Sequence, residues 1–473
     1  MTVTAEPARA HRSAAEIGRT AAGPRPLPAL GRTRAVPLPE VLDTTLPSGL
    51  RVLAAHRPGV PLAEVRLRVP FAPDPQEGDA AVTRHLAAAE VLSATLLTGT
   101  ATRDRVGIDD ELAAVGADLG VAVDPERLQV HGSGLAAGLP VVLEVLADVL
   151  TAATHPDAEV ARERSRLVER ITVARSLPRT IAREALQRKR FGRHPLAREL
   201  PAGPDVAAVG PDDVRALHRA GLVPGGAILT VVGDVDAAEA LALVERALGG
   251  WTGAQPAREL VPPPVPVPSN LELVHRAGSV QSQLRLSGPA LRRRDDGYAA
   301  LQLANLVFGG YFSSRWMENI REDKGYTYGA HSGTEFVPGG AVLSVETDVA
   351  TDVTAAALLE TRYELGRMTA VPPAADEVDA ARRYAVGSLL ISLDSHGGFA
   401  STIAALAADG VPVQWLRDHP ARLEAVTTEE VAAAAQEFFA PSAFTGVVVG
   451  DAGVVGPGLR ALGGVDLPGV DLP

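Results

Sequence analysis

The alternation of apolar and polar residues predicts strands and helices along most of the chain. Leu50–Ala55 and Ala63–Val69 alternate like strands with one buried face. Ile108–Ala117, Leu139–Ala152 and Ala158–Ser176 instead carry apolar residues at helical spacing. Helices segregated to one side of an antiparallel sheet define the α+β class. We therefore predict an α+β fold built from antiparallel sheets, each with its helices on one side.

The second half of the chain repeats the first. Val209–Val214 (V-G-P-D-D-V) corresponds to Val426–Val431 (V-T-T-E-E-V), an offset of 426 − 209 = 217. At the same offset Val231–Asp234 matches Val448–Asp451, and both read V-V-G-D. Each copy predicts a capped helix, a turn and a strand that ends at Gly-Asp. The common register indicates two homologous domains.

A proline-rich stretch separates the two copies. Val261–Pro268 reads V-P-P-P-V-P-V-P, a composition that favours stiff polyproline II. The first 40 residues lack the continuous apolar run of a secretory signal. These features predict a flexible N-terminal extension (1–45), a first domain (46–258), a linker (259–270) and a second domain (271–473).

Composition narrows the class of protein. The net charge is −12, so a nucleic-acid surface is not expected. No apolar run approaches the roughly 18 residues of a membrane helix, and we expect a cytoplasmic protein. The chain has no cysteine, so any metal site would need histidines and carboxylates.

Residues 308–328, F-G-G-Y-F-S-S-R-W-M-E-N-I-R-E-D-K-G-Y-T-Y, carry the most specific motif. They resemble the second-half signature of the pitrilysin/insulinase family of zinc metallopeptidases, in which G-G-x-x-S-R-L precedes R-E-x-x-G-x-x-Y. The resemblance implies that Arg321 and Tyr328 hold substrate and support the transition state. Gly309 and Gly310 would let the backbone approach a substrate or partner closely.

A helix over residues 314–323 is expected to end near Lys324-Gly325, so that Tyr328 starts the next strand. The family fold implies two α/β-roll domains in a clam-shell arrangement around a cavity.

The resemblance also implies a zinc site in the first half, where the family carries H-x-x-E-H. Counting back from Gly99-Thr100, the three family positions fall on Glu90, Ser93 and Ala94. The further ligand glutamate of the family aligns with Arg170. A cation at a ligand position opposes zinc electrostatically. We therefore interpret these four residues as a degenerate former metal site.

Other candidate chemistry has simpler explanations. His85 is expected to be a surface or cap histidine, and His331 with Glu335 to have a structural role. Ser395-His396 lies in a D-S-H-G-G loop, not in a nucleophile elbow. His155-Pro156 and His194-Pro195 predict turns. Nucleotide-binding glycine motifs are absent from the sequence.

The resemblance implies the zinc-less, substrate-binding subunit of a heterodimeric peptidase. Such a subunit would be inactive alone and would have no cofactor of its own. Its partners would be a homologous subunit that carries the zinc motif, and a peptide. Two alternatives stay open: a non-enzymatic scaffold or peptide-binding protein of the same fold, and a metalloenzyme with an unrecognised site.

Overall fold

The computed structural model describes residues 19–20, 23–24, 38–253 and 257–467. The chain divides into two units, Met1–Leu38 and Pro39–Pro473. In the first unit, β1 (Arg19–Thr20) pairs antiparallel with β2 (Gly23–Pro24). The rest of the predicted extension up to residue 37 lies outside the described residues. All further statements concern the second unit.

The first sheet has six strands. Their spatial order is β3 (Leu42–Thr45), β4 (Arg51–His56), β8 (Ile228–Gly233), β5 (Leu62–Pro70), β7 (Arg127–Leu135) and β6 (Asp118–Val123). β4 and β8 run parallel, and the other pairs are antiparallel. The sheet is therefore mixed, not purely antiparallel as predicted. The long connection between β4 and β8, which contains both helices and the strands β5, β6 and β7, makes the parallel pairing possible.

The second sheet repeats this order. Its strands are β14 (Val465–Asp466), β9 (Leu271–His275), β13 (Thr445–Gly450), β10 (Gln281–Pro289), β12 (Gly340–Ala350) and β11 (Ala330–Val337). β9 lies parallel to β13, as β4 does to β8. The predicted repeat is thus confirmed strand for strand, except at the β3 and β14 edges. The α+β class is confirmed as well.

The helices follow the predicted pattern closely. In the first half they are α2 (Asp79–Thr95), α3 (Arg105–Ala114), α4 (Leu139–Ala152), α5 (Asp157–Ser176), α6 (Pro178–Phe191), α7 (Gly203–Ala207), α8 (Pro211–Gly221) and α9 (Ala237–Leu248). In the second half they are α10 (Tyr298–Asn305), α11 (Arg315–Met317), α12 (Thr354–Ala370), α13 (Ala375–Ser392), α14 (His396–Ala408), α15 (Trp415–Ala425), α16 (Thr428–Phe438) and α17 (Ala452–Leu462). α3 begins three residues before the predicted Ile108, because Asp104 caps it by accepting the Gly107 N–H.

Among the described helices, no single one is long and apolar enough to cross a membrane. α13 and α14 reach that length and composition only together, as a pair bent by 107°.

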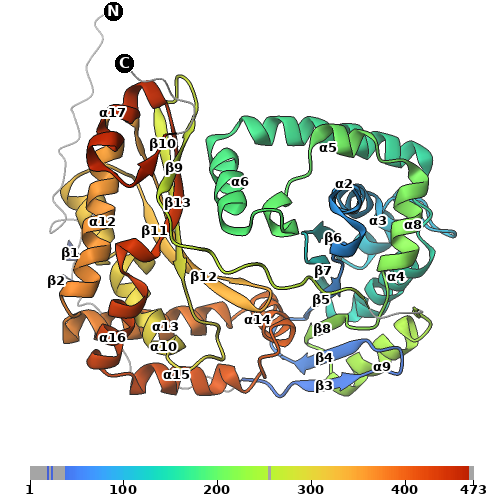
Figure 1. Ribbon diagram of the computed structural model, residues 1–473. Helices are drawn as coiled ribbons and strands as arrows, with labels where there is room; N and C mark the ends of the chain where they lie inside the picture. Colours follow the sequence, from blue (N-terminus) through green and yellow to red (C-terminus); the bar gives the residue numbers. More distant parts are fainter. Residues whose placement is uncertain (1–18, 21–22, 25–37, 254–256, 468–473) are drawn as a thin grey trace, which may run out of the picture. The chain divides into compact units, whose positions relative to one another are not determined.

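One helix of each half covers the sheet of the other half. α6 packs on β10 and β13, and α14 packs on β5 and β8. The two helices are equivalent in the repeat, since 396 − 178 = 218. Figure 1 shows α6 across the second sheet from α12 and α16. The prediction of helices on one side therefore holds only within each half, because the exchanged helix covers the remaining face.

The structure bears on the predicted limits of the N-terminal extension and of the linker. Leu42–Thr45 forms the edge strand β3, so the folded part starts before residue 46; backbone pairing with β4 orders this segment. Residues 257–270 contain neither helix nor strand, and His194 Nε2 donates to the linker carbonyl of Val261 at 3.0 Å. The remaining domain limits stay a prediction.

Candidate functional site

The motif segment of the second half, residues 308–328, contains short α-helical and π-helical turns. α10 continues into the π-helical segment η4 (Leu306–Gly310), and α11 continues into a second one, η5 (Glu318–Asp323). Lys324 caps this turn, and Gly325 takes a φ of +64° that favours glycine. The helix predicted over 314–323 is thus present, with π geometry in its second part. Such turns are frequent at functional sites.

The two glycines of the motif serve packing within the segment. A Cβ on Gly309 would lie 2.9 Å from Trp316 Cε3, and one on Gly310 would lie 2.9 Å from Leu306 Cδ2. Trp316 is fully buried and stacks on Phe308 with ring centroids 5.4 Å apart. The close approach that glycine permits is therefore made inside this chain. Approach of a substrate or partner to Gly309 and Gly310 stays a prediction.

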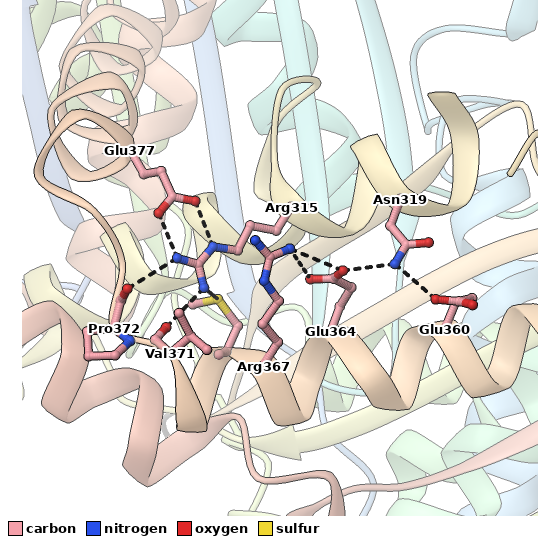
Figure 2. A network of polar contacts seen from close by, with 9 residues as sticks. Arg315, Asn319, Glu360, Glu364, Arg367, Val371, Pro372 and Glu377 are labelled. Atoms are coloured by element: carbon pink, nitrogen blue, oxygen red, sulfur yellow. Dashed lines mark hydrogen bonds and ion pairs between the residues drawn. The ribbon is translucent and has the colours of Figure 1, made fainter. Parts of the chain in front are cut away.

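An ion pair between the buried Arg315 and the half-buried Glu377 anchors the segment to the helices behind it. Arg315 Nε and Nη2 each donate to a Glu377 carboxylate oxygen at 2.6 Å, and Nη1 donates to the Val371 carbonyl at 3.1 Å. Figure 2 shows Arg315 enclosed by these groups. Glu377 also accepts the Ala374 N–H at the start of α13. The Arg315 hydrogen bonds hold the pKa of Glu377 below its ordinary value.

A second contact pins η5 to α12. Asn319 Nδ2 donates to Glu364 at 2.8 Å and to Glu360 at 3.0 Å, as Figure 2 shows. Glu364 is itself buried and pairs with Arg367 at 3.3 Å. The start of η5 is therefore held by Arg315 before it and by Asn319 in its first turn. The side chain of Arg321, on the same turn, is positioned by this support.

Arg321 lies between two aromatic rings. Its guanidinium carbon is 4.4 Å from the centroid of Phe312 and 5.5 Å from that of Tyr328. Nη1 donates to Glu322 at 2.7 Å. The side chain of Tyr328 is 92% exposed and that of Phe312 is 58% exposed. The structure therefore brings the two predicted residues together, and it adds Phe312, which sequence reasoning missed.

Tyr328 does not start the next strand as predicted. β11 begins two residues later, at Ala330. The Thr327 hydroxyl bonds the Gly329 carbonyl at 2.8 Å and the Asp348 carbonyl at 2.7 Å. These contacts replace the sheet ladder at this point, so Tyr328 projects from a bend. Together Phe312, Arg321 and Tyr328 form the aromatic–arginine site, which presents an accessible cation and a phenol hydroxyl.

The former metal positions lie on α2 and α5. Glu90, Ser93 and Ala94 are on the last turns of α2, and Arg170 is exposed on α5, which packs on α2. Burial raises the pKa of Glu90 to about 7, and the charge of Arg170 offsets part of that rise. No ion pair within 4 Å joins Glu90 to Arg170 among the described residues.

These residues do not fit a zinc ion. Glu90 supplies the single carboxylate among the four positions, and Arg170 is a cation. In the described ranges, no group of three or more His, Asp or Glu side chains is placed to hold a metal. His85 is not free to bind one either, because its Nε2 donates to the Phe71 carbonyl at 2.8 Å. It is a partly buried histidine that joins α2 to the end of β5, not a surface or cap residue as predicted.

Glu90→Gln is expected to stabilise the protein at alkaline pH. The pKa of Glu90 rises from 4.5 to about 7 on folding, so its contribution is complete below pH 4.5 and is lost as the pH rises through 7. We expect the variant to gain about 2 kcal/mol over the natural chain between pH 5 and pH 8. Urea unfolding at both pH values measures this gain. Glu169→Gln, an exposed neighbour on α5, is the control; a gain independent of pH would contradict the prediction.

Two buried histidines, His155 and His218, form a hydrogen-bond network that starts at Thr95 of α2. His155 Nδ1 is 2.9 Å from Thr95 Oγ1, its Nε2 is 2.8 Å from His218 Nδ1, and His218 Nε2 is 2.9 Å from the Leu150 carbonyl. The Leu150 carbonyl must accept, so each neutral ring donates from Nε2 and His155 Nδ1 is an acceptor. The single proton of the Thr95 hydroxyl is within reach of both His155 Nδ1 and the Val91 carbonyl, which is 2.8 Å away. Sequence reasoning expected only a turn at His155-Pro156. His155 does adopt a turn φ of +45°, but it is fully buried.

The buried His155 predicts that the stability of the folded protein decreases in acid. Burial lowers the pKa of His155 to about 3. Stability from this residue is therefore present above the ordinary histidine value and is lost as the pH falls toward 3, by about 2 kcal/mol between pH 7 and pH 5. His155→Asn, which tolerates positive φ, is expected to be less stable at pH 7 but flatter with pH. Thermal unfolding of this variant and of the exposed His331→Asn checks the slope; equal slopes would refute it.

Other histidine and serine predictions have mixed outcomes. His331 and Glu335 lie in β11, and Glu335 pairs with the buried Arg190 of α6 at 2.8 Å, a structural contact between the halves. Ser395 is not in an open loop: its hydroxyl accepts the Gly398 N–H and caps α14. It therefore has a helix-capping role.

Comparison with known proteins supplies the family context. Residues 88–204 match the sequence model of insulinase (peptidase family M16), and residues 208–384 match that of the peptidase M16 inactive domain. An uncharacterized zinc protease of Streptomyces coelicolor is 26% identical over 440 residues, covering 90% of this chain and 94% of its own. Human mitochondrial cytochrome b-c1 complex subunit 1 is 26% identical over 292 residues, covering 58% of this chain and 56% of its own.

Solved structures share the fold. The crystal structure of a peptidase M16 inactive domain from Pseudomonas fluorescens has a TM-score of 0.78 at 22% identity, covering 87% of this chain and 98% of its own. A protease from Helicobacter pylori has a TM-score of 0.77 at 17% identity, covering 87% of this chain and all (100%) of its own. At these identities the likeness concerns the fold alone.

Proposed function

This chain belongs to the peptidase M16 (insulinase/pitrilysin) family, and from that premise we propose that it is the non-catalytic, substrate-binding subunit of a heterodimeric zinc metallopeptidase. It would supply Arg321 and Tyr328 to peptide-bond hydrolysis at the zinc of a homologous partner. Residues 208–384, which include the motif segment, match the model of the family's inactive domain. The pairing and the peptide substrate belong to the proposal.

One observation carries the proposal: Arg321 and the exposed Tyr328 lie together, whereas the four metal positions retain one carboxylate, that of Glu90, and include a cation. Phe312 and Glu322 limit the directions that the Arg321 guanidinium can take, which favours donation to a peptide carbonyl. The exposed Tyr328 hydroxyl can donate to an oxyanion that develops on the scissile carbonyl. A pair built only for stability would be expected to bury the tyrosine ring.

Reconstitution tests the proposal. The chain, a homologue from the same organism that carries H-x-x-E-H, and their equimolar mixture are assayed with a quenched fluorescent peptide library. We expect cleavage by the mixture and little or none by either chain alone. Cleavage by this chain alone that dialysis against chelator removes, or a mixture no more active than the homologue, would contradict it.

A scaffold role is the second candidate, and one observation favours it. A relative that spans 58% of this chain is named as a subunit of the cytochrome b-c1 complex. Under this alternative the chain would assemble with other proteins without binding peptide. Fluorescence anisotropy with labelled peptides separates the two functions: saturable peptide binding that Arg321→Ala weakens supports the peptidase subunit, and stable assembly without peptide binding supports the scaffold.

A further inference from the structure

Residues of both halves of the chain line a cavity that shares no residue with the aromatic–arginine site. It has a volume of about 450 Å³. Its walls come from the ends of β5 and β7, the loop after β10, the β11–β12 hairpin, the last turn of α14 and the linker. A space of this size is within the usual range for small-ligand sites. Neither the family motif nor the former metal positions contribute to it.

Arginines outnumber carboxylates in the lining of this cavity, although the protein is acidic. Five arginines and three carboxylates line it, whereas the whole chain has a net charge of −12. The arginines are Arg68, Arg127, Arg292, Arg293 and Arg294. An excess of cations in a concave, partly dehydrated site favours an anionic ligand.

Three of the five arginines already have carboxylate partners. Arg127 pairs with Asp124 at 3.3 Å, Arg292 pairs with Asp295 at 2.7 Å, and Arg293 pairs with Asp409. Arg127 also pairs with Glu126, so Arg68 and Arg294 are the two lining arginines without an ion pair among the described residues.

Arg68 differs from the paired arginines of the lining, because it is enclosed and has no ion-pair partner among the described residues. In residues 38–253 and 257–467, no carboxylate oxygen lies within 4 Å of its guanidinium and it donates no side-chain hydrogen bond. Arg66, two residues earlier on the same face of β5, pairs with Glu64 at 2.7 Å. Burial and the charge of Arg127 lower the pKa of Arg68. The charges of Glu126, Asp409 and Asp124 offset part of this lowering. An enclosed guanidinium without a directly paired carboxylate is costly unless a ligand supplies one.

The remaining lining points to a singly charged ligand with an apolar body. Phe336 lies flat beneath Arg293, 3.6 Å from the guanidinium carbon, and Leu260 and Ala408 add apolar surface. Glu126 and Glu259 also line the cavity and would repel a phosphate dianion more than a carboxylate. A planar carboxylate matches the guanidinium fork in shape and charge.

We propose that this cavity is a carboxylate-binding site, in which Arg68 takes the carboxylate of a peptide C-terminus or small organic acid and the Phe336 wall contacts its apolar portion. The site is independent of Arg321 and Tyr328, so its test stands apart from that of the proposed function.

Calorimetry at low salt tests the site on the full chain, with N-acetyl-alanyl-leucine, its C-terminal amide and inorganic phosphate as probes. We expect saturable binding of the acid only. Arg68→Met is expected to weaken it at least about tenfold, since one charge-assisted hydrogen bond contributes that much. Asp409→Asn, which frees Arg293, is expected to tighten binding severalfold. Arg460→Met, an exposed arginine of α17, is the control.

Melting curves without ligand separate loss of binding from loss of fold. Removing an enclosed, unpaired cation is expected to leave the melting temperature of Arg68→Met equal or higher. Binding of the acid and amide with equal affinity, an unchanged affinity in Arg68→Met, or no saturable heat for the acid below about 10 mM would overturn the proposal. Binding of phosphate but not of the acid would also overturn it.

Discussion

Tyr328→Phe and Arg321→Ala are each expected to cut the kcat/KM of the reconstituted peptidase by about 100-fold or more, the usual effect of removing one oxyanion donor. Tyr328→Phe deletes one hydroxyl on a ring that is 92% exposed, so the fold should not change. We expect its loss to be mainly in kcat, because a developing oxyanion is bound only in the transition state. Arg321→Ala also removes contacts with the substrate, so KM should rise as well.

Matched substitutions separate this role from general damage. Tyr363→Phe alters another exposed tyrosine, on α12, and Arg460→Ala alters another exposed arginine, on α17. Both are expected to leave kcat/KM unchanged. If Tyr328→Phe matched Tyr363→Phe in activity while the mixed complex still assembled, the site would have no part in hydrolysis.

Arg315→Met is expected to destabilise the protein by about 3 kcal/mol, since it leaves Glu377 half-buried and without its cation. The Arg315 side chain is 6% exposed, so solvent cannot take its place. The pKa of Glu377 is lowered in the folded chain, so its contribution is present above the ordinary value of 4.5 and is lost as the pH falls below it. Urea unfolding at pH 7 and pH 4 measures both effects.

A double-variant cycle completes the test. Arg315→Met with Glu377→Leu removes both charges and is expected to recover a large part of the loss, because no unpaired charge remains. Arg460→Met serves as the surface control. Additive losses in the double variant would contradict the assignment. Because Arg315 supports η5, the single variant should also weaken peptide binding through Arg321.

The sequence predicted the features that depend on local pattern or on the repeat. The α4 helix, the strands β4 and β5 and the correspondence of the halves all follow from periodicity or from an offset that can be counted. Arg321 and Tyr328 were also expected to act together, and the turn at Gly325 brings them close because it lies between them. Their role in hydrolysis stays a prediction.

Contacts between residues far apart in the chain could not be predicted from the sequence. Glu377 is 62 positions from Arg315, and nothing local to either residue indicates the other. The burial of His155 depends on His218, 63 positions away. Among the described residues, the lack of an ion pair at Arg68 is seen only once the pairs of Arg127, Arg292 and Arg293 are known. Composition gives the number of charges but not which of them are left without a counter-ion.

The exchange of α6 and α14 between the sheets makes the two halves thermodynamically interdependent. Ala185 and Leu186 of α6 form one apolar cluster with Val447 of β13, so neither half buries its own sheet completely. A rigid motion that moves the halves apart displaces both helices from the sheets that they cover, because each helix lies on the sheet of the other half. The linker then acts as a tether that keeps the effective concentration of the halves high. Separation of the two halves is thus expected to be concerted, so that the sheet faces covered by α6 and α14 become exposed to solvent in one step.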